Sequence, residues 1–201
     1  MIKGAWWGMV PITLERGMHE HGDYLLQLAR LAISSQLTGK PLPTEDIPEK
    51  LKVPGACFVT LEIAGRLRGC IGSLQAHRPL AVDVIENARQ AAFHDPRFPA
   101  LTESEFAEVD LSLSLLRPPR ALSFTSEQDM LDQVRAGHHG VIIADGGRRA
   151  TFLPSVWEML PDKEMFFSQL KCKAMLPADH WSNTMEVSVY EVLYFKEKGK
   201  G

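Results

Sequence analysis

Apolar side chains recur along this chain with two different periods, and the change from one period to the other predicts its elements. Over residues 23–38, leucine, isoleucine and alanine recur at three- and four-residue steps until Gly39 and Pro41, which predicts a first helix. The segment 39–55 holds four prolines among mixed charges, and it is therefore predicted to be a surface linker.

The next stretch combines a period of two with a period near 3.6. Residues 55–74 alternate on both sides of a central Ala-Gly pair, which is typical of a β-hairpin. A helix is predicted from Pro79 to about Phe93, and residues 109–116 alternate strictly enough to predict a strand. The first half of the chain therefore reads as hairpin, helix and strand.

The same order then returns in the second half. Thr125 with Gln128 predicts a capping box for a helix that closes at Gly137. Further elements follow: a hairpin over 139–153, helices over 156–160 and 162–175, and a strand over 186–195. The repeat at 55–116 and 139–195 predicts a duplicated architecture closing on one mostly antiparallel sheet. This is an α+β fold class, because strands and crossover helices do not alternate regularly.

Composition narrows the function classes. The 201 residues are 45% hydrophobic and 23% charged, with a net charge of −3, which argues against a basic surface for nucleic acid or membranes. The three cysteines are far apart and odd in number, so neither a disulfide framework nor a metal site is predicted. No apolar run is long enough to span a bilayer. We expect a cytoplasmic protein without a cofactor.

The strongest candidate for chemistry is Cys70, in the stretch "RLRGCIGS". On a regular strand Arg68 and Cys70 share one face about 7 Å apart, and a guanidinium there would favour the nucleophilic thiolate. Gly69 and Gly72 leave the sulfur without bulky neighbours. In the alternative interpretation, these glycines permit tight twist or close helix packing, and Cys70 is a small core residue.

Other candidates are charged residues at element ends. In "HDPRF", Asp95 and Arg97 form either a structural latch or, through Arg97, a clamp for a carboxylate or phosphate. His139 next to a glycine is either a general base or a solvated loop residue. Arg149 follows a glycine turn whose amides could help to hold an anion, or it belongs to a solvated hairpin tip.

Five stretches together identify a family resemblance. "LRGCIGS", "AAFHDPRFPAL", "HGVI", "GGRRATFLPSVWEML" and "LKCKAMLPADHW" resemble the AMMECR-type domain, and more closely its bacterial form, AmmeMemoRadiSam system protein A. The likeness covers residues 22–195, so we expect an N-terminal extension over 1–21 and a C-terminal tail over 196–201. The chain departs from the family at Met175, where a glycine or similar small residue is usual.

The resemblance carries its own expectations. It implies a duplicated strand-helix unit, two unequal lobes, a barrel-like sheet and a cleft near the LRGCIG element. It also implies a Memo-type protein and a radical-SAM protein as partners. By position, the motif residues fall into three sets here: catalytic Cys70 and His139; substrate-binding Arg68, Asp95, Arg97, Arg149 and Thr151; and structural Gly69, Gly72 and Pro154.

Two functions remain open from the sequence. In the first, the protein is an enzyme or enzyme-accessory subunit that acts on a small anionic substrate in a cleft around Cys70. In the second, it is a non-catalytic binding or regulatory module that presents its arginines to a partner protein or a small anionic ligand.

Overall fold

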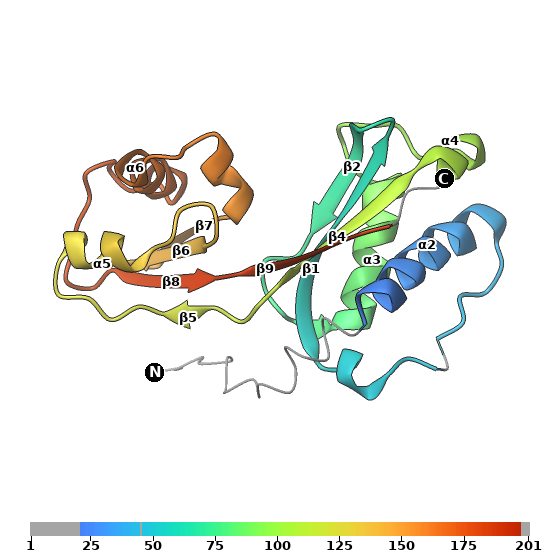
Figure 1. The fold of residues 1–201 in the computed structure, drawn as a ribbon, viewed down its shortest axis with the longest axis horizontal. Helices are drawn as coiled ribbons and strands as arrows, with labels where there is room; N and C mark the ends of the chain where they lie inside the picture. The colour runs from blue at the N-terminus through green and yellow to red at the C-terminus, as the bar shows by residue number, and fades with distance from the viewer. Residues whose placement is uncertain (1–20, 45, 198–201) are drawn as a thin grey trace. The chain divides into compact units, whose positions relative to one another are not determined.

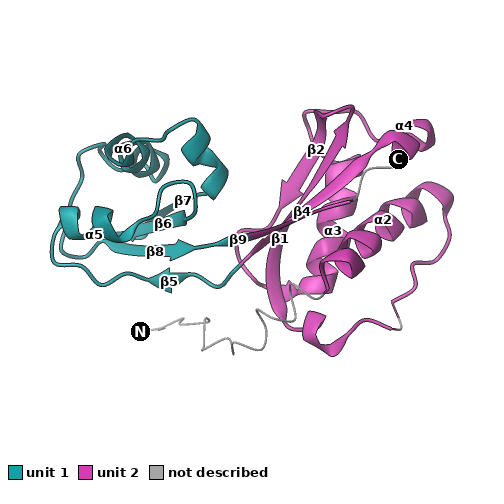
Figure 2. Cartoon of the chain, viewed as in Figure 1, with its two compact units in different colours: residues 1–8, 117–192 teal, residues 9–116, 193–201 magenta. Residues whose placement is uncertain are grey.

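The structure, a computed structural model, describes residues 21–44 and 46–197. The predicted N-terminal extension therefore lies almost wholly outside the described residues. The chain divides into two compact units of unequal size (Figure 2). Unit 1 contains residues 117–192, and unit 2 contains the described residues up to 116 together with 193–197. Two unequal lobes were expected, and each is described separately below.

Unit 2 is a sheet with two long helices on one face. Its strands follow the order β2-β1-β4-β9, and β3 pairs with the start of β1 (Figure 1). Alternation places Val59, Leu61, Leu111 and Leu113 in the core with the helices, while Thr60 and Ser112 take the opposite face. The elements are α2 (Gly22–Thr38), η1 (Glu49–Leu51), β1 (Pro54–Ile63), β2 (Arg66–Gly72), β3 (Arg78–Pro79), α3 (Leu80–Phe93), α4 (Glu103–Glu108), β4 (Asp110–Leu116) and β9 (Val192–Lys196).

Unit 1 is a smaller sheet with a core of its own. Its strands follow the order β5-β8-β6-β7. Phe166, Phe167 and Leu170 of its main helix are buried, and the Phe166 ring stacks on Trp157 with 3.6 Å between ring centroids. The elements are β5 (Arg120–Ala121), α5 (Glu127–Gln133), β6 (Gly140–Asp145), β7 (Arg148–Phe152), η2 (Pro154–Glu158), α6 (Lys163–Lys173) and β8 (Glu186–Tyr190).

The predicted duplication is present in the topology. In unit 2 the hairpin β1-β2 leads through α3 to β4, which pairs antiparallel with β1 on the side away from β2. In unit 1 the hairpin β6-β7 leads through η2 and α6 to β8, which pairs antiparallel with β6 on the side away from β7. Each repeat also places an aromatic ring over a glycine of the neighbouring strand, Phe58 over Gly72 and Tyr190 over Gly140.

Several expectations need correction. The strands within the described residues form two sheets in open paths rather than one, so the barrel-like closure is not confirmed. The second-half helix begins one residue later than predicted, because Ser126, not Thr125, accepts the hydrogen bond from the backbone of Asp129. The last predicted strand is interrupted at Glu191, which separates β8 from β9. No helix among the described residues is both long and apolar enough to cross a membrane.

Candidate functional site

Cys70 lies on β2, on the face of the unit 2 sheet opposite the α2 and α3 core. This face carries the polar residues Cys70, Thr60, Ser112 and Ser114, with Phe58 between Ser114 and Gly72. Thr60 is the direct cross-strand neighbour of both Cys70 and Ser112, so the three side chains form a row across β2, β1 and β4. The Thr60 hydroxyl donates to the half-buried Cys70 Sγ at 3.3 Å.

Asp95 and Arg97 contact the backbone of Cys70 from the segment after α3. The Cys70 N–H donates to Asp95 Oδ2 at 2.9 Å, and Arg97 Nη2 donates to the Cys70 carbonyl at 3.1 Å. Because β2 is an edge strand, these two side chains occupy backbone groups that a further strand would otherwise pair with. The predicted latch is therefore present, and it holds the strand that carries Cys70.

The latch is also a tight ion pair. Arg97 Nη2 and Asp95 Oδ2 are 2.7 Å apart, and the Arg97 side chain is 53% exposed while that of Asp95 is 2% exposed. The hydrogen bond from Arg97, helped by the backbone N–H groups of Cys70 and Arg97, holds the pKa of the Asp95 carboxyl well below its usual range despite burial. Asp95 is therefore ionised at neutral pH, and Arg97 presents the exposed half of the pair.

The positive charge near Cys70 comes from Arg97 rather than from Arg68. The register of β2 shifts between Leu61 and Glu62, so Arg68 becomes the extra residue of a β-bulge. Arg68 is 8% exposed and turns away from the thiol to Glu105, with 2.9 Å between Arg68 Nε and Glu105 Oε1. The expectation that Arg68 and Cys70 share one face was therefore wrong.

Glu105 is the residue that sequence reasoning missed. Arg68 also donates to the Pro99 carbonyl. The hydrogen bond from Arg68 to Glu105 lowers the pKa of Glu105 to about 2. Glu105 belongs to α4, which begins with a reciprocal capping box between Thr102 and Glu105. The signal was available, because Thr-x-x-Glu is the sequence signature of such a box.

The two motif glycines, Gly69 and Gly72, are required because neighbouring groups lie where a Cβ would be. A Cβ at Gly69 would lie 2.2 Å from the Ala91 carbonyl oxygen of α3. A Cβ at Gly72 would lie 2.3 Å from the Phe58 ring. The alternative interpretation of the glycines is thus correct for packing, although Cys70 itself is not a core residue.

His139 lies in unit 1 and is 5% exposed. Its Nδ1 is 3.1 Å from the Arg135 backbone nitrogen and its Nε2 is 3.2 Å from Arg135 Nε. A neutral imidazole accepts only one of these two hydrogen bonds at a time. Burial, followed by the charge of Arg135, lowers the pKa of His139. This geometry gives the predicted general base no open path to a substrate.

The other predicted residues of unit 1 take mainly structural positions. The Thr151 hydroxyl donates to the Val141 carbonyl at 2.8 Å and lies 3.1 Å from the Tyr190 hydroxyl. Pro154 starts η2. Arg149 is exposed on β7 and forms no ion pair within the described part of the chain, so it stays available to an anion.

Residues 21–44 and 46–197 contain no group of three or more His, Cys, Asp or Glu side chains placed to hold a metal ion. The polar groups around Cys70 are therefore a thiol, hydroxyls and one ion pair. Such a set can hold a small polar ligand and offers one nucleophilic atom.

Comparisons with known proteins agree on one family. The AMMECR1 family model matches residues 26–195. The chain is 35% identical to Protein MK0488 of Methanopyrus kandleri, over 89% of each chain, and 36% identical to a protein of Methanothermobacter thermautotrophicus, over 90% of this chain and 96% of that one. The crystal structure of an uncharacterized protein, PH0010, from Pyrococcus horikoshii matches with a TM-score of 0.74 and 31% identity. It covers 89% of this chain and 92% of that chain. The chain therefore belongs to the AMMECR1 family.

Proposed function

We propose that this protein is an enzyme, or a subunit that assists one, acting on a small anionic substrate at Cys70. One observation carries the proposal: a half-buried thiol lies beside an Arg97 guanidinium whose Nη1 makes no hydrogen bond within the described residues. Arg97 holds an anionic group of the substrate, and Cys70 acts as the nucleophile or as an acid/base thiol. Thr60 positions the sulfur through its hydroxyl.

The resemblance to AmmeMemoRadiSam system protein A supports a place for this chain beside a Memo-type protein and a radical-SAM protein. Three free cysteines, with no disulfide among the described residues, support a reducing compartment such as the cytoplasm. The substrate is then a small metabolite that these proteins supply or consume.

A non-catalytic binding module is the second candidate, and the Asp95–Arg97 pair favours it. Asp95 already balances the charge of Arg97, so less of that charge is left to activate the thiol. In that case Arg97 presents donors to a partner protein or a small ligand, while Cys70 only contributes to the surface.

One experiment separates the two functions. The purified protein is incubated with a small-molecule cell extract, alone and with the Memo-type and radical-SAM proteins, and metabolites are followed by mass spectrometry. The enzyme predicts that an anionic metabolite is consumed by the wild type, that Arg97→Gln slows its consumption, and that Cys70→Ala abolishes it. If Cys70→Ala matches the wild type while Arg97→Gln loses ligand retention, the binding module is correct.

A further inference from the structure

A groove in unit 1, away from Cys70, has the size and lining of a ligand site. It lies between α5 and α6 and has a volume of about 600 Å³. Pockets for small molecules usually measure about 300–1,000 Å³ and combine an apolar floor with a few polar groups. Here Leu131, Phe167 and Ala178 supply the apolar lining, and Gln128 with Ser168 supplies neutral polar groups.

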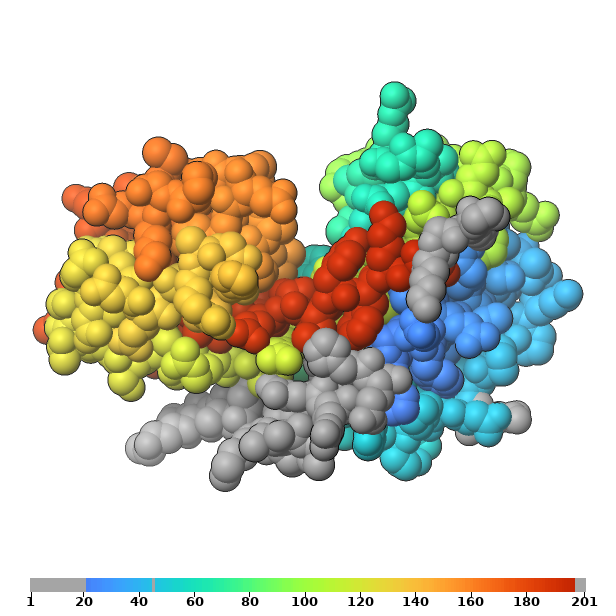
Figure 3. Space-filling view, viewed as in Figure 1, coloured from blue at the N-terminus to red at the C-terminus, as the bar shows by residue number. Residues whose placement is uncertain are grey.

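Two lysines connect the helices that border the groove. Lys171 of α6 is 3% exposed, and its Nζ lies 2.6 Å from Glu127 Oε1 of α5. Lys163 Nζ donates to the Leu131 carbonyl at 2.7 Å. In the space-filling view, the yellow segment that includes α5 packs against the orange segment that follows it (Figure 3). These contacts fix the spacing of α5 and α6 on either side of the groove.

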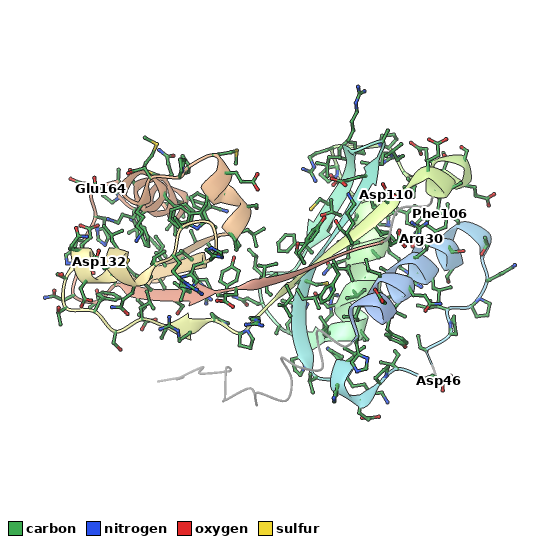
Figure 4. The ribbon with its side chains drawn as sticks, viewed as in Figure 1. Arg30, Asp46, Phe106, Asp110, Asp132 and Glu164 are labelled. Carbon is green, nitrogen blue, oxygen red and sulfur yellow. The ribbon has the colours of Figure 1, made fainter. Side chains whose placement is uncertain are left out.

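The lining of the groove carries an excess of negative charge. The lining holds three carboxylates, Glu127, Glu164 and Asp179, against the ammonium of Lys171, and the Lys163 ammonium lies at the Leu131 carbonyl on its border. Lys171 is matched by Glu127, and neither Glu164 nor Asp179 has an ion-pair partner in the described part of the chain. Asp132, on α5, adds a further carboxylate near this side of unit 1, where Figure 4 also labels Glu164.

The two unbalanced carboxylates come from segments before and after the body of α6. Glu164 stands in the first turn of α6, whereas Asp179 follows the end of that helix. Glu164 and Lys171, which both line the groove, are seven positions apart on α6, so the helix spans about 10 Å between them. Two unpaired carboxylates in a groove with an apolar lining complement a cation that carries its charges on an aliphatic stem.

We propose that this groove binds an aliphatic polyamine, with its ammonium groups at Glu164 and Asp179 and its methylenes on Phe167 and Leu131. A single ligand-sized hollow favours a small molecule over a lysine-rich protein segment, which would need a longer surface. The site is distinct from Cys70 and does not depend on the function proposed for it.

The test is calorimetric titration of the full chain with spermidine. We expect saturable one-to-one binding, with weaker binding of the shorter diamine putrescine. Glu164→Gln/Asp179→Asn should lower spermidine affinity roughly tenfold or more, because both ammonium contacts are lost. Glu158→Gln, an exposed glutamate of η2 outside the groove, is the matched control and should bind as the wild type does.

Folding of each variant is checked by its circular dichroism spectrum and unfolding midpoint. Three results would overturn the proposal: no saturation with spermidine, equal affinity in the double variant, or an equal loss in Glu158→Gln. Tighter binding of a tetralysine peptide than of spermidine would also overturn it, in favour of a protein partner.

Discussion

At the scale of single residues, Asp95 connects the stability of the fold to the candidate site. Its carboxylate accepts hydrogen bonds from the Cys70 N–H and the Arg97 N–H, and it also pairs with the Arg97 side chain. One buried group thus fixes both the edge of β2 and the direction of the guanidinium. Changes at Asp95 should therefore appear in stability and in the behaviour of Cys70 together.

Asp95→Asn should lower the free energy of unfolding at pH 7 by about 2 kcal/mol, because charged hydrogen bonds to buried groups are lost. The Asp95 pKa is depressed in the folded state, so its stabilising effect is present above the unfolded value of about 3.9 and is lost as the pH falls through the folded value. Urea titrations should show the gap between wild type and variant closing below about pH 4. Asp46→Asn, at an exposed position (Figure 4), should show no such gap. A gap independent of pH would contradict this role.

Met175 is a second residue whose side chain should affect the free energy of unfolding. It adopts φ 60 two residues after the end of α6, where Met175 N–H donates to the Cys172 carbonyl and Leu176 N–H donates to the Lys171 carbonyl. These two bonds form a Schellman motif, in which glycine is favoured at the left-handed position. The small residue that the family resemblance leads us to expect here would suit that backbone conformation.

Met175→Gly should therefore raise the free energy of unfolding by up to about 1 kcal/mol, measured from the urea midpoint. The side chain is 77% exposed, so little packing is lost. Met165→Gly, at an exposed position inside the same helix, should lower it by about 1 kcal/mol. The explanation fails if both variants change stability in the same direction.

At the scale of elements, strand β2 shows what the sequence can and cannot predict. The spacing of apolar residues located the hairpin, the helix after it and the strand at 110–116, because each of these elements buries one regular face. The bulge at Arg68 cannot be recognised in the sequence pattern, because an extra residue shows only when the pairing with the neighbouring strand is known. The sequence placed Cys70 on this strand, but it assigned the charge beside Cys70 to Arg68 instead of Arg97.

The interruption at Glu191 was hidden for a similar reason. Val187 and Val189 lie in the unit 1 core and Leu193 lies in the unit 2 core. All three are an even number of residues apart, as the buried residues of one continuous strand would be. Periodicity therefore predicted one continuous strand. Only pairing partners reveal that β8 and β9 belong to different sheets.

The contact between β2 and α3 gives a prediction at this scale. Gly69→Ala should lower the free energy of unfolding by about 1–3 kcal/mol, because the new methyl group meets the Ala91 carbonyl of the helix backbone. Gly137→Ala, where φ is +77 but no atom lies within 4 Å, should cost only the backbone preference of about 1 kcal/mol. Thermal or urea unfolding checks both. A smaller cost at Gly69 than at Gly137 would mean that the helix yields easily.

At the scale of the whole molecule, the chain repeats one topology around two separate cores. The first cluster contains residues of α2, α3, β1 and β4, and the second contains residues of α5, α6, β6 and β8. The last strand, β9, returns to the sheet of unit 2 after β8 has completed that of unit 1. Arg30, over the Phe106 ring at 5.0 Å and paired with Glu197, secures this return within unit 2 (Figure 4).

Separate cores predict separate local stabilities. Phe166→Leu should lower the protection of β6 amides from hydrogen exchange, with a free-energy loss of about 1–3 kcal/mol, while β1 amides lose less. The reciprocal variant Leu113→Ala, in the unit 2 core, should affect β1 more than β6. Equal losses in both units for either variant would show one cooperative core instead.

The central claim is that the Arg97 charge acts at the Cys70 sulfur, and paired alkylation rates test it most directly. The ratio of the Cys70 rate with anionic iodoacetate to that with neutral iodoacetamide reports local charge independently of intrinsic thiol reactivity. We predict that this ratio falls severalfold in Arg97→Gln, which leaves the Asp95 carboxylate unbalanced, and stays near the wild-type value in Arg68→Gln. An unchanged ratio in Arg97→Gln, or a larger fall in Arg68→Gln, would contradict the account.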